Sequence, residues 1–156
     1  MKTPKTIAFL AMGLLMGLLV VSGSAAAASS DDKASMDDIK KETNDLIQSL
    51  KRYSADQRDE AVQEAKAALA RIDQRIDALE TQIDGNWDQM SQSVRERTRD
   101  SLRALHKQRN EAAQWYGSLK TSSAGAWKDM KQGFSDAYQK LNEAWERSKQ
   151  AFGESN

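Results

Sequence analysis

The side chains that most often carry chemistry are scarce in this sequence. His106 is the only histidine, and there is no cysteine. Thiol catalysis, a cysteine metal site and a di-metal centre built from paired Glu-x-x-His motifs all need residues that this chain lacks. Because His106 lies between Leu105 and Lys107 in a basic stretch, we interpret it as a surface or seam residue. The sequence therefore predicts no catalytic, cofactor-binding or metal-binding residue and no enzymatic activity.

Charged residues form an acidic stripe and a basic stretch, and neither indicates a specific binding site. The acidic stripe consists of Asp73, Asp77, Glu80 and Asp84. Arg71 and Arg75 are interleaved with it, which favours a solvated or ion-paired face over a divalent-cation site. The basic stretch 95–109 has no interleaved aromatic residues, so we expect no nucleic-acid binding. No glycine-rich phosphate loop is present in the sequence.

Aromatic residues supply the remaining candidate site. In the segment 124–152, large rings recur every seven residues on both sides of a row that contains Ala137, Ala144 and Ala151. We interpret this pattern as a helix that approaches a neighbouring helix along the alanine row, with rings packing at its shoulders. The candidate interaction residues are Trp115, Tyr116, Trp127, Phe134, Tyr138, Trp145 and Phe152.

The same rings support a second interpretation. Several of them also repeat at eleven residues, which keeps an apolar stripe straight along a helix and suits a helix lying on a membrane surface. However, residues 126–152 contain five basic and four acidic side chains rather than a Lys/Arg-rich polar face. Packing within the protein is therefore the favoured interpretation, and membrane-surface binding is the alternative.

The N-terminal residues 1–28 have the form of a secretory signal peptide. Lys2 and Lys5 precede an apolar run, Ile7 to Val21, and Ala26 to Ala28 fit an A-x-A cleavage pattern. We expect an exported protein, periplasmic in a Gram-negative bacterium and otherwise secreted; an uncleaved N-terminal anchor is the alternative. Cleavage would leave 128 residues with 21 Lys+Arg and 23 Asp+Glu. This balance predicts no general attraction to nucleic acid or anionic membranes.

The mature chain is predicted to be all-α. Its only proline, Pro4, lies in the signal peptide, and good helix formers dominate the rest. We expect residues 29–35 to be disordered and residues 36–152 to form one helical domain. Apolar residues recur at three- and four-residue steps in three series. The first is Met36, Ile39, Thr43, Leu46, Leu50 and Tyr53; the second is Val62, Ala65, Leu69, Ile72, Ile76, Leu79 and Ile83; the third starts at Val94 and includes Thr98, Leu105, Ala112, Leu119 and Met130.

Interruptions of these series predict where the helices end. Ser54 and Gln57 form a capping box at a change of phase, which favours a break or kink. A turn is expected at 85–91, where the Gly85-Asn86 pair can adopt positive φ and Ser91 can cap a new helix. The apolar phase continues through Ser123, so we expect at most a bend there.

A fold-back near residue 88 would give a long antiparallel helical hairpin. It would bring the acidic and arginine stripes together in the pairs Asp73–Arg103, Asp77–Arg99 and Glu80–Arg95. Two helices of about fifty to sixty residues would extend roughly 75–90 Å. Such a hairpin is too thin to bury its apolar faces, so either the arms fold back into a four-helix bundle or two hairpins form a homodimer.

The run 86–134 resembles small, uncharacterised exported bacterial helical coiled-coil proteins, chiefly in NWDQMS, QRNEAAQWYGSLK and AWKDMKQGF. The resemblance implies a bacterial origin and a helical fold, without an activity for particular residues. We therefore expect a non-enzymatic structural or interaction protein of the bacterial envelope. Its partner would be a second copy or another envelope protein. An amphipathic lipid-binding protein and a helical periplasmic chaperone are the alternatives.

Overall fold

The computed structural model describes residues 28–153, with side chains from Met36 onward. Most of the expected signal peptide lies outside the described residues. Within them there are helices and turns but no strand, which confirms the predicted all-α class. The helices are α1 (Ala28–Arg52), α2 (Arg58–Asn86), α3 (Gln92–Lys120) and α4 (Trp127–Gly153).

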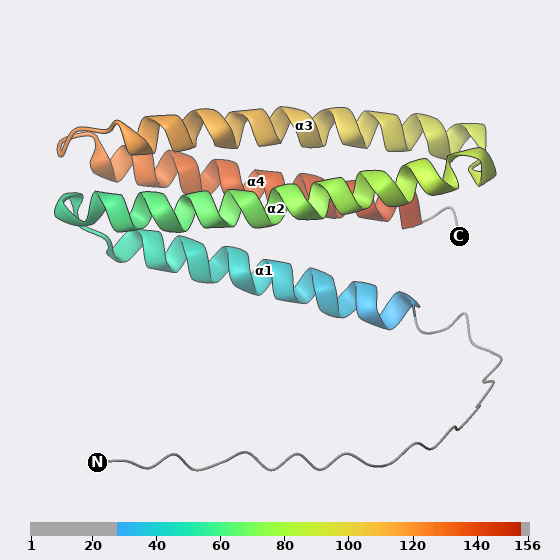
Figure 1. Cartoon of the computed structure of the whole chain (residues 1–156), viewed down its shortest axis with the longest axis horizontal. Helices are drawn as coiled ribbons and strands as arrows, with labels where there is room; N and C mark the ends of the chain where they lie inside the picture. Colours follow the sequence, from blue (N-terminus) through green and yellow to red (C-terminus); the bar gives the residue numbers. More distant parts are fainter. Residues whose placement is uncertain (1–27, 154–156) are drawn as a thin grey trace, which may run out of the picture.

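The four helices form a bundle in which each runs antiparallel to the one before it (Figure 1). Of the two arrangements left open by the sequence, the fold-back into a four-helix bundle is the one adopted. Helices α3 and α4 pack most closely, whereas α1 lies mainly against α4 and has few contacts with α2. Helix α1 also diverges from α2 toward its N-terminal end (Figure 1). The α3–α4 pair is therefore the most tightly packed part of the bundle.

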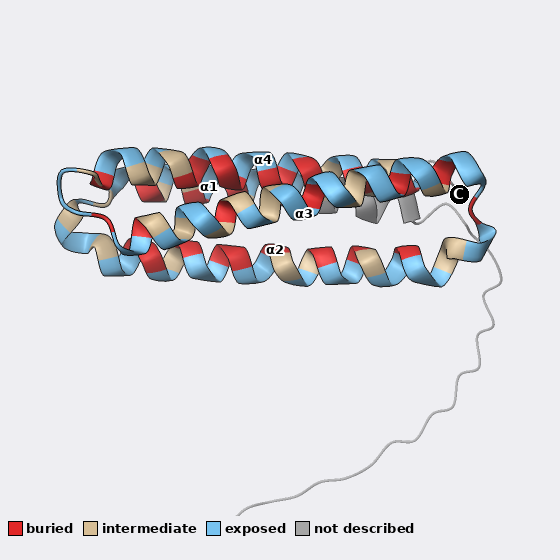
Figure 2. Cartoon of the chain, turned by 90° about the horizontal axis from the view of Figure 1, so that it is seen from above, coloured by how far each residue is buried: buried red, intermediate tan, exposed pale blue. Residues whose placement is uncertain are grey.

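The apolar series predicted from the sequence face the centre of the bundle. Buried residues follow the inner side of each helix, and exposed residues follow the outer side (Figure 2). The second series is buried throughout, from Val62 at 7% exposure to Ile72 at 0%. Burial of these continuous stripes removes apolar surface from water, the main favourable contribution to folding.

The break predicted near Ser54 is present. Helix α1 ends at Arg52, and the chain turns through a short 3-10 turn, Ala55–Gln57, before α2 begins. The backbone N–H of Ser54 donates to the Gln57 side-chain oxygen at 3.2 Å, as the capping box requires. Because this turn reverses the chain, α1 becomes a separate helix.

The turn between α2 and α3 lies where the sequence placed it, but its backbone differs from the prediction. Gly85 and Asn86 belong to the last turn of α2, and Asn86 has φ −108° rather than a positive value. The reversal is made by a 3-10 turn, Trp87–Gln89, followed by extended backbone at Met90 and Ser91. The Ser91 side chain accepts a hydrogen bond from the Val94 N–H at 3.4 Å, so Ser91 is the predicted helix cap.

The prediction of at most a bend near Ser123 was wrong. Helix α3 ends at Lys120, and α4 starts at Trp127 in the opposite direction. Serine hydroxyls satisfy the backbone on both sides of this loop. Ser122 Oγ donates to Leu119 O at 3.0 Å, and Ser123 Oγ accepts from the Ala126 N–H at 3.3 Å. The apolar phase continues through 121–126 although the helix does not.

The N-terminal boundary of the helical domain also differs from the prediction. Residues 29–35, expected to be disordered, belong to α1, which begins at Ala28. No proline or glycine separates this segment from the rest of the helix. A helix therefore extends through it without an interior breaker.

Candidate functional site

The rings of α4 lie inside the bundle. Five of the seven candidate interaction residues are buried: Trp127 (4% exposed), Phe134 (0%), Tyr138 (2%), Trp145 (4%) and Phe152 (7%). The adjacent alanine row is buried at Ala137 and Ala144 as well. This confirms the interpretation of the pattern as a packing face. It also means that these five rings serve contacts within the chain.

The polar atoms of three of these rings bind backbone oxygens of neighbouring segments. Tyr138 Oη donates to Ala68 O at 3.3 Å, and Trp145 Nε1 donates to Arg75 O at 3.2 Å. Both links join residues 70 positions apart, so α2 and α4 run parallel with a fixed register over one heptad. A buried Tyr or Trp whose polar atom finds a partner contributes packing without an unsatisfied donor.

Trp127 makes the corresponding contact at the end of the bundle. Its Nε1 donates to Tyr53 O, 3.0 Å away, in the turn between α1 and α2. Next to it, Arg58 Nη1 donates to Ser122 O at 2.6 Å. The two loops at this end are therefore tied together by side chains of α2 and α4.

Trp115 and Tyr116 lie elsewhere, on α3. Tyr116 is half-buried, whereas Trp115 is 37% exposed and is the only exposed large hydrophobic residue in the described part of the chain. The Trp115 ring lies directly over Gly133 of α4, where a Cβ atom would collide with it. The interaction role expected for the ring residues remains a prediction, and the structure leaves Trp115 as the exposed ring that could serve it.

The predicted pairing between the charged stripes was wrong in register. Asp73 pairs with Arg109 instead of Arg103: Arg109 Nη2 donates a hydrogen bond to Asp73 Oδ2 at 2.6 Å. Glu80 contacts His106 Nε2 at 2.6 Å rather than Arg95. The partnership with Asp73 raises the pKa of the Arg109 guanidinium. Helices α2 and α3 are antiparallel as expected, but Asp73 and Glu80 each meet a side chain further along α3. The expected Asp77–Arg99 pair is not formed, and Arg99 lies over the Trp87 ring.

Two of the arginines that were expected to pair with α2 lie against Trp87 instead. The guanidinium carbons of Arg95 and Arg99 lie 5.6 Å and 4.6 Å from the centre of its ring, within the range of cation–π attraction. Arg95 Nε also donates to Trp87 O at 2.9 Å. The 3-10 turn thus places a ring where it attracts the two arginines that were expected to reach α2.

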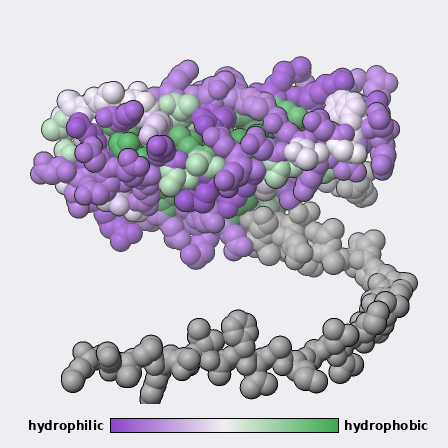
Figure 3. Space-filling view, viewed as in Figure 1, coloured by the Kyte–Doolittle hydropathy of each residue, from purple (hydrophilic) through white to green (hydrophobic). Residues whose placement is uncertain are grey.

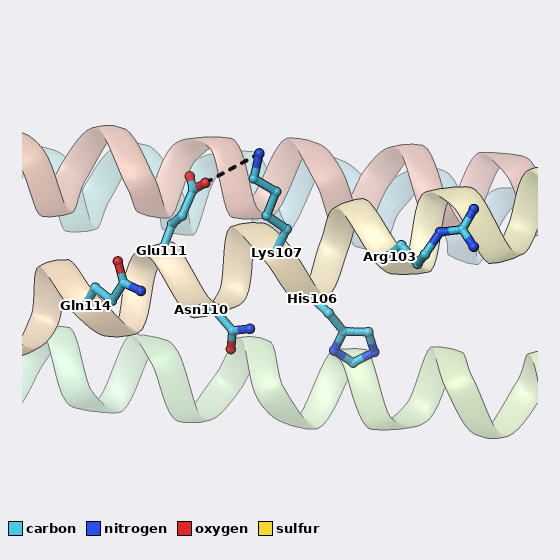
Figure 4. A pocket seen from close by; sticks show the side chains of 6 residues that line it. All are labelled: Arg103, His106, Lys107, Asn110, Glu111 and Gln114. Carbon is cyan, nitrogen blue, oxygen red and sulfur yellow. Dashed lines mark ion pairs between the residues drawn. The ribbon is translucent and has the colours of Figure 1, made fainter.

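The outer face of α3 is polar and open. A shallow hollow there is lined only by α3 side chains: Arg103, His106, Lys107, Asn110, Glu111 and Gln114 (Figure 4). His106 points toward α2, and Lys107 pairs with Glu111 at 3.9 Å on the other side. Within the described residues no group of three or more His, Cys, Asp or Glu side chains is placed to hold a metal ion. The hollow offers solvated charges without a convergent set of ligands.

A different site, which the sequence did not predict, lies between α1 and α4. Lys51, near the C-terminal end of α1, faces Lys128, Lys131, Gln132 and Ser135 of α4 across a cavity of about 150 Å³. Lys131 Nζ donates to Tyr53 O at 2.6 Å and to Lys51 O at 3.3 Å. Burial lowers the pKa of Lys131. We call these five side chains the lysine cavity.

Sequence reasoning missed the lysine cavity because its two sides come from separate helices. The signal available was a lysine in the last turn of one predicted helix and two lysines near the start of another. Their convergence depends on α1 lying beside α4. That adjacency follows from the second fold-back at 121–126, where only a bend was expected.

The face of the bundle seen in Figure 3 is hydrophilic. In Figure 3, polar and charged residues cover most of the visible face, and hydrophobic atoms show in the gaps along the middle of the bundle. None of the helices in the described part of the chain contains an apolar stretch long enough to cross a membrane. Comparison with models of known protein families, with curated proteins and with solved structures gave no match.

Proposed function

We propose that this chain is a non-enzymatic, exported interaction protein of the bacterial envelope that binds a protein partner through α3. The observation that carries the proposal is that Trp115 is exposed, whereas the other large rings of the described residues are buried or half-buried. Tryptophan is enriched at the energetic centres of protein interfaces because it buries a large area with few rotatable bonds. A ring fixed on the surface therefore favours a docking role for this face.

The position of Trp115 supports the proposal further. Because Gly133 has no side chain, the ring packs closely against α4 at this position and is partly immobilised before any partner arrives. An anchor that is already ordered loses less conformational entropy on binding than a free side chain. The polar side chains Asn110, Glu111 and Gln114 precede Trp115 on α3 and would form a polar rim beside it.

The proposed localisation rests on the N-terminal sequence. A positive start, an apolar run and an A-x-A pattern are the three parts of a secretory signal. The partner is then another envelope protein or a second copy of this chain. A near-neutral mature chain is consistent with recognition by shape and apolar contact rather than by net charge.

The two alternatives have less support. A lipid-binding helix 124–152 would have to take Phe134, Tyr138 and Trp145 out of the bundle interior. A holding chaperone needs a broad exposed apolar surface, and within the described residues Trp115 is the only large hydrophobic side chain that is exposed. Insertion of the α4 rings into lipid and holding of unfolded chains both need an apolar surface that the described residues do not present.

The proposal is tested by placing a photoreactive benzoylphenylalanine at position 115 in the full-length chain, expressed in the source bacterium. A matched variant carries the same group at Gln63, an exposed glutamine of α2 outside the proposed contact. We expect one discrete cross-linked species with 115 and much less with 63, because only the first lies at the proposed contact. Equal labelling at both positions, or none at either, would refute docking through this face.

A further inference from the structure

The lysine cavity lies at the end of the bundle where α1 ends and α4 begins, at the left in Figure 1. The three lysines that line it come from two helices; Lys51 and Lys128 are exposed, and Lys131 is half-buried. Among the described residues, neither Lys51, Lys128 nor Lys131 forms an ion pair with a carboxylate. Most clustered charges on proteins are balanced by neighbours of opposite sign, so three unbalanced cations around one small cavity are unusual.

Acidic residues near the cavity do not neutralise it. Asp136 accepts a hydrogen bond from Gln132 Nε2 at 2.7 Å on the exposed side of α4. Asp129 is exposed next to Lys128 in sequence and forms no ion pair with another described residue. The negative C-terminal end of α1 is already occupied, because Lys131 covers the oxygens of Lys51 and Tyr53. The cavity is therefore left with a positive lining.

Ser135 provides the second, independent observation. It is only 5% exposed and lines the cavity, yet its hydroxyl has no hydrogen-bond partner among the described residues. Two buried helical hydroxyls bond to the carbonyl four residues earlier, Thr43 to Ile39 O (2.8 Å) and Ser148 to Ala144 O (2.9 Å), whereas Thr98 Oγ1 in the bundle interior has no partner among the described residues. Unlike Thr98 Oγ1, the Ser135 Oγ is not fully enclosed, so it stays open to the cavity and can donate to a ligand there.

We propose that the lysine cavity binds a phosphate-type oxyanion. Three ammonium groups and one hydroxyl supply donors that a tetrahedral anion can accept, and lysine is a common point-charge ligand for phosphate. A cavity of about 150 Å³ has room for one phosphoryl group. The group can be free phosphate or the phosphodiester of an anionic lipid headgroup, since both present the same oxygens. This site is separate from the proposed α3 docking face and does not depend on it.

The site is tested by titrating inorganic phosphate into the full chain by isothermal titration calorimetry, with sodium chloride holding the ionic strength constant. We expect saturable binding that Lys128→Gln and Ser135→Ala each weaken roughly three- to tenfold, the loss typical of one hydrogen bond to a charged group. Lys140→Gln is the matched control, because Lys140 is an exposed lysine on the same helix outside the cavity. Its dissociation constant should match that of the unaltered chain.

Ser135→Ala keeps the result interpretable if a lysine variant unfolds. Removing a hydroxyl without a partner breaks no hydrogen bond within the chain, so the urea midpoint should not fall. Weaker phosphate binding at unchanged stability would support the site. Phosphate binding that is absent from the unaltered chain, or equally reduced in all three variants, would overturn it.

The source of the phosphoryl group is distinguished by co-sedimentation with vesicles. Vesicles of phosphatidylglycerol and phosphatidylcholine mixed are compared with vesicles of phosphatidylcholine alone. Binding to the first that is lost in Lys128→Gln but kept in Lys140→Gln assigns the cavity to a lipid headgroup. Phosphate binding in solution without vesicle binding assigns it to a free anion. Vesicle binding that Lys128→Gln, Ser135→Ala and Lys140→Gln all weaken equally would reflect general charge attraction and contradict the proposal.

Discussion

At the scale of single residues, the buried hydroxyl of Thr98 is expected to lower the stability of the fold. It is 1% exposed on α3, and its Oγ1 has no hydrogen-bond partner. Thr98→Val keeps the shape of the side chain and removes the buried polar atom. We expect this change to stabilise the fold by about 1 kcal/mol, because an unpaired buried hydroxyl costs ~1–3 kcal/mol. The measurement is the free energy of unfolding in urea.

Thr43 provides the control for this prediction. It is 6% exposed, but its hydroxyl donates to Ile39 O at 2.8 Å. Thr43→Val should therefore bring no gain, since it removes a satisfied group. If both substitutions shift the unfolding free energy equally, hydroxyl satisfaction is not the cause.

Tyr138, which bonds α4 to α2, is expected to make the stability of the fold depend on pH. Burial raises the pKa of its hydroxyl above the ordinary value of 10.0, more than the hydrogen bond with Asn142 lowers it. The unfolded chain therefore releases this proton at a lower pH than the folded chain. Above pH 10 the unfolded state binds fewer protons, so stability falls as pH rises toward the folded pKa.

Tyr138→Phe separates the two contributions of this hydroxyl. At pH 8 the variant should be less stable by about 0.5–1.5 kcal/mol, because the bond to Ala68 O is lost. Between pH 10 and 11 the difference should shrink, since phenylalanine has no proton to release. Lysines titrate in both proteins and cancel in the comparison. A stability difference that stays constant with pH would contradict the proposed shift.

At the scale of elements, the α3–α4 contact depends on Gly133. A Cβ added there would lie 2.6 Å from Cη2 of Trp115 and closer still to other ring carbons. Gly133→Ala should therefore overpack the contact by ~1–3 kcal/mol, partly offset by the ~1 kcal/mol that alanine gains over glycine within a helix. In a Trp115→Ala background the overlap is gone, and the same change should be stabilising.

The test is a double-mutant cycle of these two substitutions, read by chemical unfolding. A coupling free energy of about 1–3 kcal/mol is expected, because the two sites share one contact. Additive effects would mean that the ring moves aside without cost. Gly117→Ala is the comparison for helix propensity alone, since nothing lies within 4 Å of a Cβ there.

The sequence predicted the buried face of each helix well and the connections between helices less well. Periodicity identified the buried stripes because each helix must present one apolar side, and the Ser54–Gln57 box marked a true end. Periodicity failed at 121–126, because a six-residue loop can restart a helix in the same phase. Charge alone assigned Arg95 and Arg99 to α2, whereas both lie against the Trp87 ring, a contact that charge patterning does not predict. Helix adjacency, and with it the lysine cavity, required the three-dimensional arrangement.

At the scale of the whole molecule, the bundle predicts a short particle. Its longest helices have 29 residues, which corresponds to a length of about 44 Å. A hairpin with uninterrupted arms would extend to roughly 75–90 Å. X-ray scattering from the chain without residues 1–28 should therefore give a distance distribution with one main peak and no shoulder in the longer range. A rod-like profile would show that α1 and α4 do not fold back in solution.

Four antiparallel helices also bring the start of α1 and the end of α4 to the same end of the bundle (Figure 1). The lysine cavity is at the other end, and Lys51 lies 23 residues after Ala28 along α1, a distance of roughly 35 Å. A purification tag, fluorescent protein or surface tether joined directly to Ala28 or Gly153 would therefore leave the cavity unobstructed. The start of α1 and the end of α4 therefore offer an attachment point at the end of the bundle opposite the lysine cavity.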